Sequence, residues 1–324
     1  MKINIAIIGC GNLGTRHIQG LGKSKYKLNV HFYDVSIISL NKCKSFISEH
    51  SNELKNIIPI PYHDLSSLIS LDIKFDLVII ATTAFKRSNL INFLSKNIRS
   101  SAWIIEKPIT QSFREIDELL NAFELTTNNV WVNFARREIP WHQEMKFKYF
   151  ENKRINMKIT GKKIGIGSNI SHFVDLINFW SDEVPISVDV SGLSNEWYDT
   201  KRNGYKDVDG VISVKFSSGS ELSIISNDHF QELLIKAELE FDKINYQINE
   251  QKGTLRTNGT LIEKGTMLLQ SQITGTLFDR IYEQELCNLT PLDLAAENYK
   301  KIISALIFHW NISNNINCET VPIT

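Results

Sequence analysis

The chain has 324 residues, of which 42% are hydrophobic and 22% are charged, and its 36 Lys and Arg residues balance its 36 Asp and Glu residues. This length suits two domains of ordinary size, and neutrality without a basic stripe makes nucleic acid and anionic membranes poor partners. Its four cysteines form no CxxC pair, and no apolar stretch reaches the roughly 20 residues of a membrane span. We therefore expect a cytoplasmic protein without a metal site.

The first third of the sequence alternates strand and helix patterns. Apolar runs predict strands at 3–8, 28–33, 58–60, 75–82, 103–105 and 130–134. Apolar residues at helical spacing predict helices at 13–21, 37–47, 90–94 and 113–123. Strands that alternate with helices imply βαβ crossovers and a parallel sheet covered on both faces, with the proline-containing strand at 58–60 on its edge.

Beyond about residue 135 the pattern changes from alternation to a series of extended segments. Helical patterns at 141–150 and 169–180 precede strands at 184–190, 208–216, 221–225, 233–240 and 244–248, with a hairpin turn at 217–220 and a last helix at about 291–310. We therefore predict a doubly wound Rossmann domain at 1–128. An α+β domain with a large open antiparallel sheet is expected at 129–324.

A glycine-rich turn with the sequence GCGNLG follows the first strand and opens the first helix, which is the context of a GxGxxG dinucleotide fingerprint. The first glycine allows a tight turn, the second lets a pyrophosphate approach the backbone, and the third allows helix and strand to pack closely. A turn that binds nothing is the alternative. The residues expected to contact the dinucleotide here are Gly9, Gly11, Asn12, Leu13 and Gly14. Arg16 and His17, further along this helix, are interpreted as surface or packing residues.

The second strand ends at an acidic residue, Asp34, 20 positions after Gly14. A carboxylate at this position hydrogen-bonds the adenosine ribose and repels a 2′-phosphate. Val35 and Ser36 follow it and offer no cation to balance such a phosphate. These residues therefore favour NAD over NADP.

Two further strand ends carry polar residues, and ligands bind outside the carboxyl ends of parallel strands. Ala81, Thr82 and Thr83 end the fourth strand, where they either line the cofactor phosphates or cap the next helix. Glu106 and Lys107 end the fifth strand before a proline. A lysine there can hold a substrate hydroxyl or oxyanion, although an isolated loop lysine is usually a solvated surface residue.

The order of these motifs resembles the glucose–fructose oxidoreductase and inositol dehydrogenase family (Gfo/Idh/MocA). The resemblance continues at VNFARR, residues 132–137, at GIGSNISHFVD, residues 165–175, and in the last helix, so that it covers nearly the whole chain. It implies an NAD(P)-dependent oxidoreductase that transfers a hydride between a nicotinamide cofactor and a hydroxyl or keto carbon of a sugar, cyclitol or nucleotide sugar. It also implies a last helix that packs back, and a homodimer or homotetramer formed through the C-terminal sheet.

The resemblance assigns roles to individual residues. Lys107 would position the reacting hydroxyl and contact the cofactor together with Glu106, and His172 would be the general acid/base. Family members commonly carry an aspartate four residues before this histidine, where this chain has Ser168, which either hydrogen-bonds substrate or caps the helix. The other candidates for substrate contact are Arg136, Asn169 and Asp175. For Arg136 an ion pair between domains is the alternative, and for Asp175 a structural or histidine-orienting role.

Two other functions stay open at this stage. The loss of the aspartate at Ser168 suits a catalytically weakened, NAD-binding regulatory or interaction protein on the same scaffold. A lyase or hydrolase that uses NAD transiently is the third possibility. Intact Lys107 and His172 favour the dehydrogenase.

Overall fold

The computed structural model describes residues 2–123, 129–239 and 244–324. Residue contacts divide the chain into two compact units. The first unit comprises Met1–Ile109, Asp117–Glu138 and Leu268–Asp293, and the second comprises Thr110–Ile116, Ile139–Met267 and Leu294–Thr324. The first unit therefore takes one of its segments from late in the sequence.

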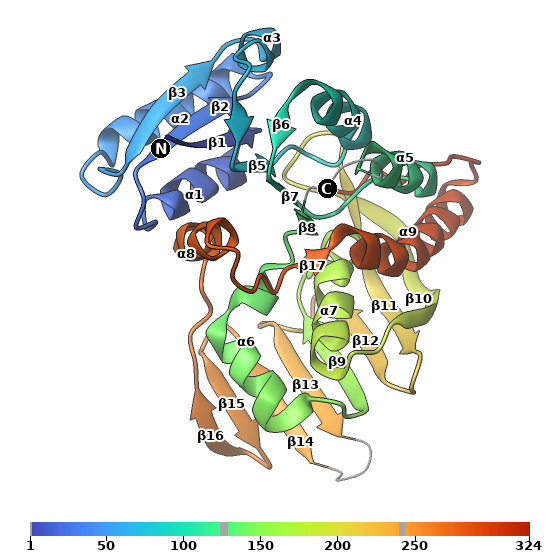
Figure 1. Cartoon of the computed structure of the whole chain (residues 1–324). Helices are drawn as coiled ribbons and strands as arrows, with labels where there is room; N and C mark the ends of the chain where they lie inside the picture. The colour runs from blue at the N-terminus through green and yellow to red at the C-terminus, as the bar shows by residue number, and fades with distance from the viewer. Residues whose placement is uncertain (1, 124–128, 240–243) are drawn as a thin grey trace. The chain divides into compact units, whose positions relative to one another are not determined.

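The first unit is built around a sheet with the strand order β17-β8-β7-β5-β1-β2-β3 (Figure 1). Its neighbouring strands pair in parallel, apart from the antiparallel pair β17 and β8. Strand order reverses at β1, so the carboxyl ends of β1 and its neighbours form the crevice in which such sheets bind ligands. The strands are β1 (Ile3–Ile8), β2 (Leu28–Tyr33), β3 (Ile57–Tyr62), β5 (Leu77–Ile80), β7 (Ala102–Ile105), β8 (Asn129–Val132) and β17 (Thr290–Pro291).

The strand predicted at 75–82 is interrupted at Asp76. The backbone N–H of Asn4 donates to the Asp76 carboxylate at 2.8 Å, and the Asp76 N–H donates to the Asn4 carbonyl at 2.8 Å. The residues before the interruption form β4 (Lys74–Phe75), which pairs with β6 (Arg99–Ser100) in a separate small sheet. A side chain that bonds the neighbouring backbone thus replaces the regular ladder at this point.

The helices predicted in the first third of the chain are confirmed. The helices up to residue 138 are α1 (Asn12–Leu21), α2 (Ile37–Glu49), α3 (Leu65–Ile69), α4 (Arg87–Asn97), α5 (Phe113–Phe123) and the 3₁₀ turn η1 (Ala135–Glu138). The proline-containing strand β3 lies at the edge of the sheet, as predicted.

Helix α8 (Gln270–Tyr282) was not predicted from the sequence and packs against α1 (Figure 1). Two glycines allow this close approach, because a Cβ on Gly20 would lie 2.8 Å from the Thr274 Cβ and a Cβ on Gly275 would lie 2.4 Å from the Gly20 carbonyl oxygen. Small residues at a helix crossing let the two backbones approach. The contact makes α8 part of the first unit.

The second unit contains a large sheet with the order β10-β11-β12-β9-β13-β14-β15-β16. Its pairs are antiparallel, as predicted, except that β9 and β12 run in parallel. Strands β9, β15 and β16 were not predicted. The strands are β9 (Ile155–Gly161), β10 (Pro185–Asp199), β11 (Lys206–Phe216), β12 (Glu221–Ser226), β13 (Leu234–Leu239), β14 (Asn245–Asn249), β15 (Thr254–Thr257) and β16 (Thr260–Lys264).

The hairpin turn predicted at 217–220 joins β11 to β12 and is confirmed. Gly219 adopts a φ of +107°, which favours glycine. The buried Glu183 carboxylate accepts hydrogen bonds from the Ser218 N–H at 2.8 Å and from the Ser220 hydroxyl at 2.6 Å. The turn is therefore held from outside the hairpin as well as by its own backbone.

One face of this second sheet is covered by the almost completely buried helix α7 (Ile166–Ser181), which packs on β11 and β12. The other helical segments here are α6 (Pro140–Met145), the π-helical turn η2 (Lys146–Phe150) and α9 (Leu292–Asn314). A parallel Rossmann sheet in one unit and a large, mostly antiparallel sheet with helices in the other confirm the predicted fold class.

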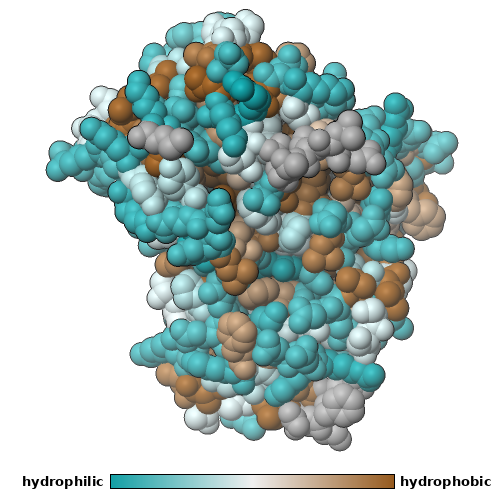
Figure 2. Space-filling model, viewed as in Figure 1, coloured by the Kyte–Doolittle hydropathy of each residue, from teal (hydrophilic) through white to brown (hydrophobic). Residues whose placement is uncertain are grey.

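Hydrophilic and hydrophobic residues are interspersed on the face of the molecule that Figure 2 shows. Apolar atoms contribute more than half of the surface of an ordinary folded protein, so this mixture by itself marks no binding site. Within the three described stretches of the chain, none of the helices combines the length and apolar character that a membrane span requires.

Candidate functional site

The glycine turn between β1 and α1 depends on backbone that approaches too closely for side chains. Gly9 has a φ of +99°, and a Cβ there would lie 2.8 Å from the backbone of both Ala81 and Thr82. A Cβ on Gly14 would lie 1.9 Å from the Gly9 carbonyl oxygen. Both glycines therefore seat the start of α1 directly against β1 and the end of β5.

The second glycine of the turn has a different environment. Gly11 is the N-cap of α1, and a Cβ there would meet no protein atom within 4 Å. The N-cap provides no side-chain hydrogen bond, and the first turn of α1 contains no acidic residue. Backbone N–H groups and the positive end of the helix dipole are thus open to an anion, beside the exposed Asn12 and half-buried Leu13. This geometry fits the pyrophosphate of a dinucleotide.

Asp34 lies at the end of β2 and contacts the same turn. Its carboxylate accepts from the Cys10 N–H at 2.6 Å through Oδ2 and from the Ser36 N–H at 2.7 Å through Oδ1. A carboxylate has about four lone-pair sites, so further acceptor capacity is left for hydroxyl groups. The neighbouring Val35 is 89% exposed.

The residues after β5 border the glycine turn. The Thr82 hydroxyl oxygen is buried and has no hydrogen-bond partner within the described residues. Such a buried polar atom next to Gly9 indicates a place for a ligand or a water molecule. Capping of the next helix by Thr82 or Thr83 is excluded, because α4 begins at Arg87 with Lys86 as its N-cap.

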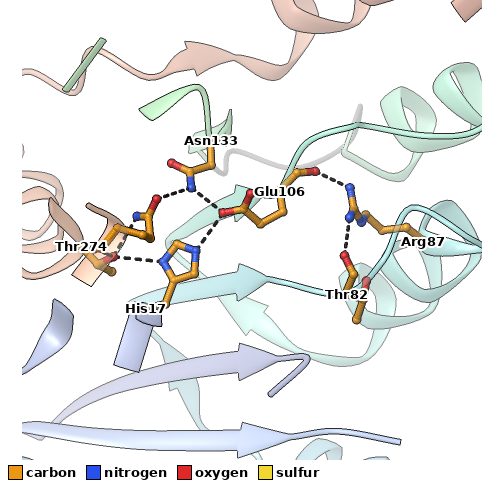
Figure 3. A network of polar contacts seen from close by, with 7 residues as sticks. His17, Thr82, Arg87, Glu106, Asn133 and Thr274 are labelled. Carbon is orange, nitrogen blue, oxygen red and sulfur yellow. Dashed lines mark hydrogen bonds and ion pairs between the residues drawn. The ribbon is translucent and has the colours of Figure 1, made fainter. Parts of the chain in front are cut away.

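Glu106, at the end of β7, belongs to a buried polar network (Figure 3). Its carboxylate is bound by the His17 Nε2 at 2.9 Å and by the Asn133 amide, and His17 Nδ1 lies 3.1 Å from the Thr274 hydroxyl. Burial raises the pKa of Glu106, but the hydrogen bond and charge of His17 and the Asn133 amide outweigh it, and the net pKa is lowered. The Glu106 side chain thus points into the interior of the unit. The half-buried Lys107 follows it.

Arg87 and Asn133 are polar residues of this region that the sequence analysis missed. Asn133 directly follows β8, as Glu106 follows β7, so the strand-end rule applied to β8 would have found it. Arg87 is the first residue of α4 and had no comparable signal. His17, in contrast, is 0% exposed, which confirms its interpretation as a packing residue.

In the second unit, the start of α7 is built around a buried carboxylate from β11. Asp207 accepts from the Gly167 N–H at 2.8 Å and from the Ser168 hydroxyl at 2.6 Å. Gly165, the N-cap, has a φ of +69°, and a Cβ there would lie 3.0 Å from the Asp207 Oδ2. Burial raises the pKa of Asp207, against the opposing effect of these hydrogen bonds. Asp207, which comes from β11, therefore caps the N-terminus of α7.

The substrate residues expected around His172 lie on this helix. Ser168 is inside the first turn of α7, so the alternative that it is the N-cap is wrong. His172 follows one turn later and is half-buried, and Asp175 is 3% exposed. The Asn169 side chain donates to the Ile164 carbonyl at 2.7 Å.

Asp207 was missed by the sequence analysis, since its contact with Ser168 spans 39 residues. The fourth residue expected to contact substrate, Arg136, lies in η1 and belongs to the first unit. The described residues contain no group of three or more His, Cys, Asp and Glu side chains suited to a metal ion.

The fold and the glycine turn define a class, the NAD-binding oxidoreductases with a Rossmann domain. Residues 3–134 match the GFO_IDH_MocA model, which is described as an oxidoreductase family with an NAD-binding Rossmann fold. Over these residues the chain is therefore similar to the NAD-binding domain of the Gfo/Idh/MocA family. This match confirms both the resemblance and the class of enzyme predicted from the sequence.

Solved structures are similar over nearly the whole chain, at low sequence identity. An oxidoreductase from Agrobacterium radiobacter in complex with NAD+, L-tartaric acid and magnesium is 16% identical over 96% of each chain, with a TM-score of 0.69. The WlbA dehydrogenase from Bordetella pertussis in complex with NADH and UDP-GlcNAcA is 14% identical over 96% of each chain, with a TM-score of 0.66.

UDP-N-acetylglucosamine 3-dehydrogenase GnnA from Acidithiobacillus ferrooxidans is 12% identical over 98% of each chain, with a TM-score of 0.65. A comparison with curated protein sequences found no match. At these identities the structural similarities show that the fold is shared.

Proposed function

We propose that the protein is an NAD-dependent dehydrogenase that transfers a hydride between the cofactor and a hydroxyl or keto carbon of a sugar, cyclitol or nucleotide sugar. The observation that carries the proposal is the open N-terminus of α1 at Gly11, with the Asp34 carboxylate bound to the same turn. Sugar acids or nucleotide sugars are bound in two of the similar structures, which supports this substrate class.

The cofactor site would use the backbone of the glycine turn for the pyrophosphate and Asp34 for the ribose hydroxyls. Thr82 would supply its buried hydroxyl as a further hydrogen-bonding group. The absence of a cation at Val35 and Ser36 supports NAD over NADP. When bound, NAD supplies the acceptor for the hydride.

The chemistry would use two side chains. The Lys107 ammonium would donate a hydrogen bond to the substrate oxygen and stabilise the negative charge that develops on it. A ring nitrogen of His172 would take the hydroxyl proton while the carbon loses a hydride and the carbon–oxygen double bond forms. In the reductive direction His172 would return that proton.

Ser168 would act beside His172 on the same face of α7, since residues four apart on a helix are neighbours. Its hydroxyl donates to the Asp207 carboxylate at 2.6 Å. Family members commonly carry a carboxylate at the position of Ser168. In this chain Asp207 supplies a carboxylate next to that position. This arrangement supports an enzyme over a weakened regulator.

The open face of the second sheet is proposed as the contact between copies of the chain. Strand β9 alternates buried residues such as Met157 with exposed residues such as Lys158, so this face is accessible within the unit. Sedimentation velocity tests the proposal. A dimer or tetramer is expected, and a monomer at all concentrations would contradict it.

Calorimetry and absorbance test the proposed function. NAD should bind more tightly than NADP, and the NADH band should appear with at least one of myo-inositol, L-tartrate and UDP-N-acetylglucosamine. His172→Ala should keep NAD affinity and lower turnover by about 10²-fold or more. A folded wild-type chain that binds neither dinucleotide would refute the proposal, and unchanged turnover in His172→Ala would remove that residue from the reaction.

A further inference from the structure

The loop that carries Lys107 is held by a buried arginine. Arg87, which is 2% exposed, donates from Nη1 to the carbonyl oxygens of Glu106 and Pro108, the residues on either side of Lys107. The Ile109 carbonyl lies 3.4 Å from the same nitrogen. The guanidinium thus contacts the main chain on both flanks of the lysine.

The same guanidinium also reaches the neighbouring loop. Its Nη2 donates to the Thr82 carbonyl, and Figure 3 shows Arg87 between Thr82 and Glu106. Thr82 follows β5 and its backbone lies against Gly9. Arg87 therefore joins the loop of Lys107 to the loop that borders the glycine turn.

The Glu106 side chain anchors the loop from a different direction. His17, from α1, and Asn133, from the end of β8, bind its carboxylate, so the main chain before Lys107 is fixed through its side chain as well as through its carbonyl. Asn133 also donates to Gln270 of α8 at 2.8 Å. The residue before Lys107 is thus held at two separate points.

We propose that Arg87 is a positioning residue for Lys107, which it holds at a fixed place relative to the glycine turn by binding the carbonyls of both loops. A guanidinium suits this task because its N–H donors lie in a rigid planar fork, whereas a lysine ammonium is a point charge on a flexible stem. The catalytic meaning of this inference rests on the proposed function. The grip of Arg87 on the two loops is testable without it.

Hydrogen exchange of the ligand-free protein tests the grip. We expect Arg87→Lys and Arg87→Gln to raise exchange of amides in 82–86 and 105–109 by about tenfold or more, while strands β1 and β2 keep their protection. The matched control is Arg99→Lys, since Arg99 binds the Asp72 carboxylate at 2.8 Å on the surface of the same unit. Exchange in the two loops that equals the control would overturn the proposal.

A double-mutant cycle tests whether Arg87 acts through Lys107. With NAD and whichever of myo-inositol, L-tartrate or UDP-N-acetylglucosamine the wild type oxidises, Arg87→Lys should lower kcat about 10- to 100-fold and change NAD affinity less than about threefold. In a Lys107→Met background the same change should have almost no further effect. An equal loss of kcat in both backgrounds would show a merely structural role and refute the proposal.

The failures of the two proposals are distinguishable. A wild type that binds no dinucleotide refutes the proposed function, while the exchange experiment still decides whether Arg87 holds the loops. If neither Arg87 variant folds, the wild type gives a second measurement, because a guanidinium whose nitrogens bind the carbonyls of Thr82, Glu106 and Pro108 rotates slowly. Separate Nη–H signals of Arg87 in nitrogen-15 NMR would support the proposal, and a freely rotating guanidinium would contradict it.

Discussion

The two units each bury a carboxylate beside a proposed catalytic residue, and they hold it in different ways. Glu106 of the first unit is bound by an imidazole and an amide, and its pKa is lowered. Asp207 of the second unit is bound by backbone N–H groups and a hydroxyl, and its pKa is raised by burial. A basic partner offsets the desolvation of a buried carboxylate more fully than neutral donors do. The network around Glu106 is therefore suited to holding the main chain before Lys107 in a fixed position.

The largest expected effect is on stability, from removal of Glu106. Glu106→Ala removes the carboxylate that both buried side chains, His17 and Asn133, bind, and we expect the free energy of unfolding to fall by about 3–5 kcal/mol. Urea denaturation measures it. The control Glu49→Ala removes an exposed carboxylate and should change stability by less than about 0.5 kcal/mol. A loss in Glu106→Ala as small as in the control would show that the network does not stabilise the unit.

The corresponding change in the second unit should have a smaller effect. Asp207→Ala removes the acceptor at the start of α7, and we expect a loss of about 2 kcal/mol, in the range of helix caps. Ser168→Ala, which leaves the backbone bonds of Asp207, should cost about 1 kcal/mol. Asp199→Ala serves as the control, since the Asp199 carboxylate, which pairs with Lys206 at 2.9 Å, is 78% exposed. If Ser168→Ala lowers the free energy of unfolding as much as Asp207→Ala, the hydrogen bond from the Ser168 hydroxyl contributes more to the cap than the backbone N–H bonds do.

A third carboxylate, Asp34, should affect ligand binding more than stability. It is half-buried and retains acceptor capacity, unlike the enclosed Glu106. We expect Asp34→Ala to weaken NAD binding by about tenfold and to improve NADP binding relative to NAD. Calorimetry with both dinucleotides measures the preference. An unchanged preference would remove Asp34 from the cofactor site.

The smallest expected effect is a difference between Glu106 and Asp207 in how their contributions to the free energy of unfolding depend on pH. A lowered pKa means that Glu106 adds stability above the ordinary value of 4.5 and that this contribution is lost as the pH falls below it. The contribution of Asp207 depends on pH with the opposite sign, because a raised pKa makes the folded chain bind a proton more tightly than the unfolded chain. Its contribution therefore grows as the pH falls toward the ordinary value of 3.8.

Urea denaturation from pH 7 to pH 4 compares the wild type with Glu106→Gln and Asp207→Asn. The deficit of Glu106→Gln should be largest at neutral pH, and that of Asp207→Asn should increase toward acid. Equal trends in the two variants would contradict the assigned directions of the pKa shifts.

The same contrast explains what could be predicted from the sequence. Asp34, Glu106 and Lys107 were found because each ends a parallel strand, and strand ends follow from local apolar patterns. Asp207 and Arg87 could not be found in this way. Asp207 acts on a helix 39 residues away, and Arg87 binds carbonyl oxygens, which every residue has.

The missed elements have similar reasons. Helix α8 shows a mixed sequence, and its close approach to α1 uses a glycine, Gly275, which gives no apolar signal in the sequence. Strand β9 is paired on both sides by strands from later in the chain, so no local turn signal marks it. The GxGxxG motif, in contrast, could be recognised from the sequence because its glycines lie within six residues, between a strand and a helix that both have clear local patterns.

The seating of α8 on α1 has a consequence for how this protein can be made and divided. The ribosome completes six of the seven strands of the main sheet of this unit early, yet residues 268–293, with β17 and α8, emerge only after most of the second unit. Until then α1 lacks the helix that covers it at Gly20, and His17 lacks Thr274. A fragment that stops at Glu138 would carry the complete cofactor motif without its closing helix, so excised versions of this unit need residues 268–293 supplied in cis or in trans.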